Sequence, residues 1–147
     1  MKQQSVANLQ KSLLDLAETN KWLNRSFGIC QKIGLKKEYL PDEFDAYENL
    51  TSRFARTCDL LINKVYRAID QVELELSGTI IDILNRAEKR DLVNSVQEIR
   101  EIKELRNMIA HDYANPQLKE IFQNVFKHIP VLSNLVDRAI EYGKKYS

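Results

Sequence analysis

The sequence predicts an all-α protein, an up-and-down bundle of five to six helices. Apolar residues recur at steps of three and four over long stretches, the spacing that places them on one face of a helix. Glycine and proline are scarce, four and three among 147 residues, which leaves little chain for extended loops. A chain of this length can bury a substantial core, so we expect a single helical domain over residues 1–147.

The first two predicted helices form a long antiparallel hairpin. The first runs from Val6 to about Lys32, and Gly34 lies just past its end, where a left-handed residue is favourable. The second runs from about Glu43 to Glu75 with the most regular apolar stripe in the sequence, and Asp42 is its expected N-cap. Stripes this long predict that the two helices pack side by side along their whole length.

Two shorter helices are expected next. The first spans Thr79 to Ala87, and the charged stretch Arg86 to Asp91 after it is expected to be a solvated turn. The next helix begins near Leu92. It ends between Ala110 and Tyr113, because Pro116 disfavours helical geometry in the residue before it.

Apolar residues continue at helical spacing to the C-terminus. Residues 118–129 predict a fifth helix and residues 131–140 a sixth. Pro130, between them, either kinks a helix or ends it. The predicted bundle is therefore closed by one bent helix or by two.

Composition limits the function classes. Lys and Arg total 22 against 21 Asp and Glu, so the chain has no overall basic field and any RNA affinity must be local. No apolar run approaches the ~20 residues that cross a bilayer, so we expect a cytoplasmic protein without a membrane span. Cys30 and Cys58 continue apolar stripes and are expected to be buried thiols. Neither histidine, His111 nor His128, has the Glu-x-x-His spacing of di-iron bundles, and we expect no metal and no cofactor.

The fourth predicted helix carries a cation where a core residue is expected. Four of its apolar residues fall within one arc of about 140°, and Arg106 projects near the middle of that arc. The arc holds Val96, Ile99, Ile102 and Ile109. Burying an unpaired guanidinium costs several kcal/mol, so Arg106 must meet a carboxylate, line a wet cleft or face an anionic ligand.

His111 follows Arg106 by five residues, which on an unbroken helix turns it ~140° away around the axis. The two side chains would then not share a surface. Either the helix ends early enough for His111 to turn back, or two copies of the chain meet along this seam and line one groove with Arg and His from both. We favour the second arrangement.

The stretch from Arg106 to Tyr113 resembles the Arg-x4-His-x-Tyr signature of the HepT branch of the HEPN superfamily. Asn107, directly after the arginine, and the position at the end of the fourth helix strengthen the resemblance. It implies a HEPN-like bundle and a metal-independent endoribonuclease toxin of a toxin–antitoxin pair. In such an enzyme Arg106 and His111 are the catalytic pair at a homodimer cleft, and Asn107 supports the site.

The resemblance also implies a protein partner. In the HepT family the matching tyrosine receives AMP from a nucleotidyltransferase antitoxin, MntA, which places bulk and negative charge where RNA phosphates would bind. We therefore expect a cognate MntA-type antitoxin, an RNA substrate and AMPylation of Tyr113. From the residue alone, Tyr113 could also be an aromatic plug against the following helix.

Four basic residues are candidate contacts to RNA phosphates: Arg53, Arg56, Arg100 and Lys103. The alternative is that they lie on solvated helix faces with short-range ion pairs, such as Arg56 with Asp59 or Arg100 with Glu104. Spacing alone leaves both interpretations open.

A non-catalytic subunit that binds substrate beside a nucleotidyltransferase is the alternative function. HEPN-type proteins of that kind often lack the Arg or the His, whereas Arg106, His111 and Tyr113 are all present here. A plain helical adaptor that dimerises through its hairpin is a further possibility. It leaves the charge of Arg106 in an apolar arc unexplained.

Overall fold

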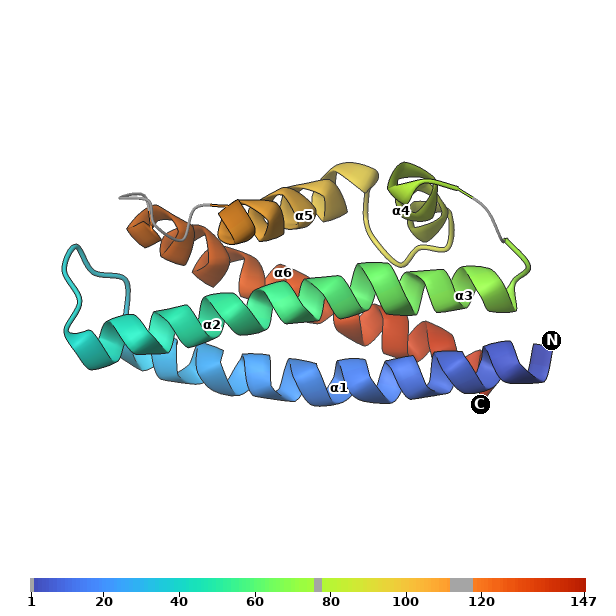
Figure 1. Ribbon diagram of the computed structural model, residues 1–147, viewed down its shortest axis with the longest axis horizontal. Helices are drawn as coiled ribbons and strands as arrows, with labels where there is room; N and C mark the ends of the chain where they lie inside the picture. The colour runs from blue at the N-terminus through green and yellow to red at the C-terminus, as the bar shows by residue number, and fades with distance from the viewer. Residues whose placement is uncertain (1, 76–77, 112–117) are drawn as a thin grey trace.

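The computed structural model describes residues 2–75, 78–111 and 118–147, and this part of the chain is helical and contains no strand (Figure 1). The predicted all-α bundle is confirmed. In chain order the elements are α1 (Lys2–Ile33), α2 (Pro41–Asp59), the π-helical η1 (Leu60–Tyr66), α3 (Arg67–Val72), α4 (Ile80–Lys89), α5 (Val96–His111), α6 (Leu118–Gly143) and the 3-10 turn η2 (Lys144–Tyr146).

The predicted long hairpin is present. α1 runs antiparallel to one continuous helical stretch that passes through α2, η1 and α3 (Figure 1). α6 packs against both α1 and α2, and α5 packs against α2 and α6. The helix α2 therefore lies between α1 and α5, and residues on its exposed side can contribute to surfaces shared with either neighbour.

The turn between the two helices of the hairpin follows simple backbone rules. Gly34 has φ +81 and its N–H donates to Cys30 O at 2.8 Å, as expected for a glycine that ends a helix. The predicted N-cap of the second helix is wrong, because Leu40 holds that position instead of Asp42. Pro41 takes the first helical position, where its missing N–H is not needed, and Glu43 Oε1 accepts the Leu40 N–H at 2.9 Å.

The middle of the second hairpin helix is π-helical, which its regular spacing did not predict. The segment η1 begins at Leu60, the residue directly after Asp59. Its exposed side carries Asn63 and Lys64. Such wider turns are rare and occur frequently at functional sites.

The connection around α4 differs from the prediction. Thr79 caps α4, with its N–H donating to Asp82 Oδ2 at 2.9 Å. The stretch from Arg86 to Asp91 is not a solvated turn, because its first four residues belong to α4 and its two arginines form ion pairs with a buried carboxylate. α5 begins at Val96, four residues later than predicted, because the apolar pair Leu92 and Val93 packs into the core from a loop.

The fifth and sixth predicted helices are one helix, α6, which continues through Pro130. Pro130 is exposed, whereas Ile129 and Leu132 beside it are fully buried. Burial of the neighbouring residues outweighs the backbone hydrogen bond that the proline removes. Of the two outcomes expected at Pro130, termination is therefore wrong.

The core is apolar and aromatic. Tyr47 stacks on Phe122 with ring centroids 5.3 Å apart, which joins α2 to α6. Cys30 and Cys58 are buried free thiols, as predicted, and burial raises the pKa of Cys30 to about 11. Among the helices that the structure describes, none is long and apolar enough to cross a membrane.

Candidate functional site

Arg106 forms a two-pronged ion pair with Asp59, and this joins α5 to the end of α2. Its Nε donates to Asp59 Oδ1 at 2.7 Å and its Nη2 to Oδ2 at 2.8 Å. The paired, planar geometry is the strongest form of a guanidinium–carboxylate contact. The structure thus provides the carboxylate that a cation in an apolar arc requires.

The ion pair is open to solvent. The Arg106 side chain is 26% exposed and the Asp59 side chain 42%. The hydrogen bonds that Arg106 donates to Asp59 raise the pKa of Arg106 above its already high ordinary value, so the guanidinium is charged at every physiological pH. Its Nη1 amino group makes no hydrogen bond within the described part of the chain, which leaves a donor edge available to an anion.

Asp59 is the residue that spacing assigned to the wrong partner. The expected pair between Arg56 and Asp59 is absent, since Asp59 binds Arg106, 47 residues away in sequence. Two signals point to Asp59: the charge of Arg106 needs a carboxylate, and Asp59 directly follows the fully buried Cys58 at the edge of the apolar stripe. Neither signal shows that the helix of Asp59 packs beside the helix of Arg106.

The surface beside the ion pair forms a shallow hollow between α5 and the start of η1. Lys103, Arg106 and Asn63 line it together with Asp59 and Cys58. Burial raises the pKa of the Cys58 thiol, so Cys58 is not a thiolate nucleophile. The chemistry offered here is a pair of cations, Lys103 and Arg106, one of them fixed by Asp59.

His111 is the last described residue of α5, and its side chain is exposed. The helix is still intact at this residue, so His111 points ~140° away from Arg106 and lies ~7.5 Å further along the axis. One copy of α5 therefore does not direct the two side chains to the same surface. The helical geometry at His111 does not favour the arrangement in which His111 turns back, and the arrangement with two copies remains a prediction.

The other candidate residues are distributed over several surfaces. Asn107 and Arg100 are exposed on α5, and the expected Arg100–Glu104 pair is absent. Arg56 is exposed on α2. Tyr113 and the helix-ending segment 112–116 lie outside the described residues.

Arg53 is directed to α1. Its Nη1 donates to Trp22 O at 3.1 Å and to Ser26 Oγ at 2.6 Å, and its guanidinium lies 5.6 Å from the centre of the Trp22 ring. These contacts engage Arg53 in the hairpin interface. It is the least available of the four candidate phosphate contacts.

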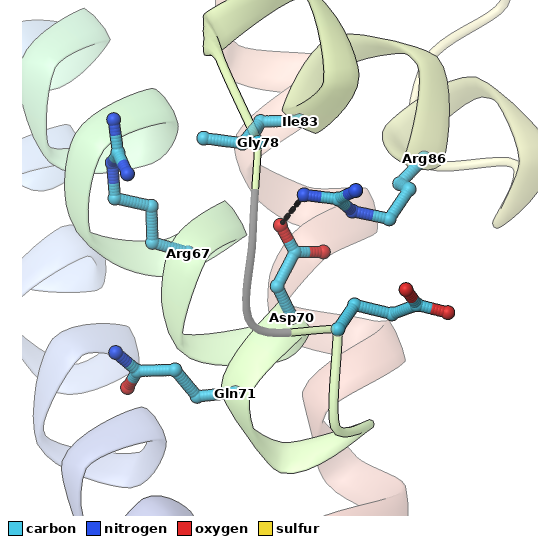
Figure 2. A pocket seen from close by; sticks show the side chains of 7 residues that line it. Arg67, Asp70, Gln71, Gly78, Ile83 and Arg86 are labelled. Carbon is cyan, nitrogen blue, oxygen red and sulfur yellow. Dashed lines mark hydrogen bonds and ion pairs between the residues drawn. The ribbon is translucent and has the colours of Figure 1, made fainter.

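A second group of ion pairs, which the sequence did not predict, joins α3 to α4. Asp70 is buried and accepts a hydrogen bond from Arg86 (Figure 2) and another from Arg90. Arg90 Nε also donates to Glu73 Oε1 at 2.8 Å. The charges that were expected in a solvated turn therefore fasten α4 onto the hairpin.

The same group reaches the C-terminal end of the chain. The hydroxyl groups of Tyr142 and Tyr146 both donate to Glu73 Oε2. Burial alone would raise the pKa of Glu73, but the hydrogen bonds from the two tyrosines and Arg90 outweigh it and hold the pKa below its ordinary value. Within the described ranges, no group of three or more His, Cys, Asp or Glu residues is placed to hold a metal ion.

Comparison with known families identifies the chain. Residues 29–139 match the model of the HepT-like family, whose description is Ribonuclease HepT-like. The match covers most of the chain and includes the whole of α5, which carries Arg106 and His111. Neither a curated protein nor a solved structure gives a significant match. This chain belongs to the HepT-like ribonuclease family, as the stretch around Arg106 predicted.

Proposed function

We propose that the protein is a metal-independent endoribonuclease, the toxin of a toxin–antitoxin pair, that cuts RNA with Arg106 and His111 in a cleft between two copies. Membership of a ribonuclease family sets the reaction class. The single observation that carries the site is the open ion pair of Arg106. Its guanidinium is fixed in place by Asp59, and its Nη1 group makes no hydrogen bond to a described residue.

The two side chains suit the two chemical tasks of RNA cleavage. Arg106 binds the scissile phosphoryl group through its exposed edge and stabilises the charge that develops there. His111 moves protons at the 2'-hydroxyl or at the leaving oxygen, because an imidazole can both accept and donate a proton. Asp59 is a positioning residue that holds the guanidinium, and the exposed Asn107 supports the site beside it.

A homodimer reconciles this chemistry with the geometry of α5. Arg106 and His111 of one chain point in directions ~140° apart. A two-fold axis beside α5 would bring Arg106 of one protomer to the partner's His111 and repeat the arrangement on the other side. Each cleft would then contain one complete pair of catalytic groups.

Flanking cations extend the site. Lys103 lies beside Arg106 in the same hollow, and Arg56 and Arg100 are exposed. We assign these residues to contacts with phosphates next to the scissile one. Arg53 makes a smaller contribution, because α1 already binds its guanidinium.

The proposal includes control by an MntA-type nucleotidyltransferase antitoxin, and the position of Tyr113, two residues after His111, supports it. An AMP group on Tyr113 would place a phosphate beside the catalytic groups and repel RNA. Co-expression with the antitoxin followed by mass spectrometry should show AMP on the peptide that contains Tyr113. An unmodified peptide would exclude this form of control.

The catalytic assignment is tested by purified His111→Ala acting on RNA. Cleavage should fall by about a hundredfold or more, the usual effect of removing a general acid or base, while the helical circular dichroism and the unfolding midpoint are retained. His128→Ala is the matched control, because His128 lies on α6 and its ring is hydrogen-bonded to Asn124 O. This variant should cleave RNA normally. A fully active His111→Ala protein would refute the proposal.

A further inference from the structure

We propose that a groove between α1 and the η1–α3 stretch binds the sugar–phosphate backbone of the RNA strand next to the scissile phosphate. The groove adjoins the hollow at Arg106 and has a volume of about 480 Å³, within the range of ~300–1,000 Å³ typical of ligand sites. Its charged and amide side chains include Lys11, Asp15, Asn63, Lys64, Arg67 and Gln71. The position of the strand next to the scissile phosphate rests on the proposed ribonuclease function. RNA binding by the groove can be tested without that function.

The groove carries cations that have no ion-pair partner among the described residues. Lys11, Lys64 and Arg67 are exposed, and none forms an ion pair with any residue that the structure describes. Asp15 is the one carboxylate among the groove's described lining that could face them, and it is not paired either. Three positive charges against one negative charge make a local anion site in a chain of nearly zero net charge.

The groove is continuous with the candidate active site. Asn63 lines both the groove and the hollow that contains Arg106. Asn63 and Lys64 belong to the π-helical segment, which starts one residue after Asp59. The unusual backbone of η1 therefore connects the residue that holds Arg106 to the residues that open the groove.

The side chains of α3 divide into two sets. Figure 2 shows Asp70 paired with Arg86, while the side chains of Arg67 and Gln71 extend away from that pair. Arg67 and Gln71 also line the groove together with residues of α1. Asp70 is buried and engaged by arginines, so it does not neutralise Arg67. Arg67 is left to act on a ligand in the groove.

The lining favours a nucleic-acid backbone over a protein partner. Stable protein interfaces have apolar and aromatic centres, but this groove contains no aromatic side chain among its described residues and only Leu60 and Ala68 are apolar. Without an aromatic side chain it offers no surface on which bases stack. Lysine, arginine and amide groups instead contact phosphate and sugar, which positions a strand without reading its sequence.

Salt dependence of RNA binding tests the groove directly. Binding of a fluorescent single-stranded RNA is measured in the His111→Ala background, so that cleavage does not interfere, at several salt concentrations. The double variant Lys64→Ala/Arg67→Ala should reduce the slope of log Kd against log salt by about 1.4, because each lost phosphate contact on a single strand contributes about 0.7. The matched control Arg25→Ala/Lys32→Ala removes two exposed charges of α1 outside the groove and should leave the slope unchanged.

A variant that is expected to tighten RNA binding distinguishes a loss of groove contacts from damage to the fold. Asp15→Asn removes the carboxylate of the groove and should lower the Kd for RNA, a gain that a misfolded protein cannot show. An unchanged slope in Lys64→Ala/Arg67→Ala, or an equal fall in the control, would overturn the proposal. The proposal would also be overturned if Lys64→Ala/Arg67→Ala lost binding to an acidic protein while the slope of log Kd against log salt for RNA stayed the same.

Failure of the groove and failure of the ribonuclease are distinguishable. If wild-type protein cuts no RNA while the slope falls as expected, the groove stands and the catalytic proposal fails. If wild-type protein cuts RNA while the slope does not change, the catalytic proposal stands and the groove fails.

Discussion

Two arginine–carboxylate groups in this molecule use the same chemistry in opposite settings. In the first, Asp59 holds Arg106 alone, and both side chains are substantially exposed, 42% and 26%. In the second, the Asp70 side chain is only 5% exposed and is shared by Arg86 and Arg90. In the first pair, the Nη1 group of Arg106 has no partner among the described residues. In the second, Arg90 also binds Glu73, which accepts hydrogen bonds from the C-terminal end of the chain.

The difference distinguishes an ion pair that is available to a ligand from one that stabilises the fold. Buried charges must be matched by neighbouring charges and hydrogen bonds, because each unmatched one is costly to desolvate. An exposed ion pair contributes little to stability and is free to exchange its partner for a ligand. A sequence that places arginine near apolar residues is compatible with both outcomes, and only the number and exposure of the partners distinguish them.

The largest expected effect is on stability. Asp70→Ala removes the carboxylate that Arg86 and Arg90 share in the core, and the loss should cost about 3 kcal/mol or more in the free energy of urea unfolding. Cleavage per folded molecule should not change. Glu38→Ala is a matched control, because Glu38 is 91% exposed in its pair with Lys119, and little change is expected. Equal stability of the two variants would show that the buried ion pairs of Asp70 stabilise the fold no more than an exposed pair does.

The next largest effect is on catalysis. Arg106→Lys keeps the charge but lacks the planar fork that binds Asp59 and a phosphate together. Initial rates of RNA cleavage should fall about a hundredfold, while the free energy of unfolding changes by less than about 1 kcal/mol. A lysine variant that cuts RNA at the normal rate would show that the fork is dispensable.

A smaller effect is expected from the partner of Arg106. Asp59→Asn leaves a hydrogen-bond acceptor but removes the charge that fixes the guanidinium, so cleavage should fall by about tenfold through loss of positioning. If Asp59 acts only by positioning Arg106, the loss should appear in kcat more than in KM. A change in KM alone would instead indicate a role in RNA binding.

The smallest effect concerns pH. Hydrogen bonds hold the pKa of Glu73 below its ordinary value of 4.5, so its contribution to stability is present above that pH and is lost as the pH falls through the lower folded value. Urea unfolding between pH 6 and pH 3, a range of about three units, should show a shallower acid loss of stability in Glu73→Gln than in the wild type. Identical slopes would mean that Tyr142 and Tyr146 do not stabilise the charged form.

Local rules determined what the sequence could predict. Apolar spacing predicted the hairpin and the position of α5, and Gly34 marked the end of α1. The charge of Arg106 in an apolar arc correctly required a partner. Each of these features depends on residues that are close together in the sequence.

The features that were missed depend on packing between distant segments. Asp59 is 47 residues from Arg106, and nothing in the spacing of α2 separates it from a solvated residue. The charged residues after residue 85 were predicted to form a solvated turn, because Asp70, which pairs with Arg86 and Arg90, lies in another helix. Pro130 was compatible with a break or a bend, and burial of Ile129 on α6 decides for continuity.

Mixed dimers test the central claim most directly. Arg106→Ala and His111→Ala chains, each inactive alone, are co-expressed with different tags and the mixed dimer is purified. If Arg106 of one protomer acts with the partner's His111, each mixed dimer contains one intact site, and it should cleave RNA at about half the wild-type rate per dimer. A mixed dimer that is as inactive as its parents would contradict a shared cleft.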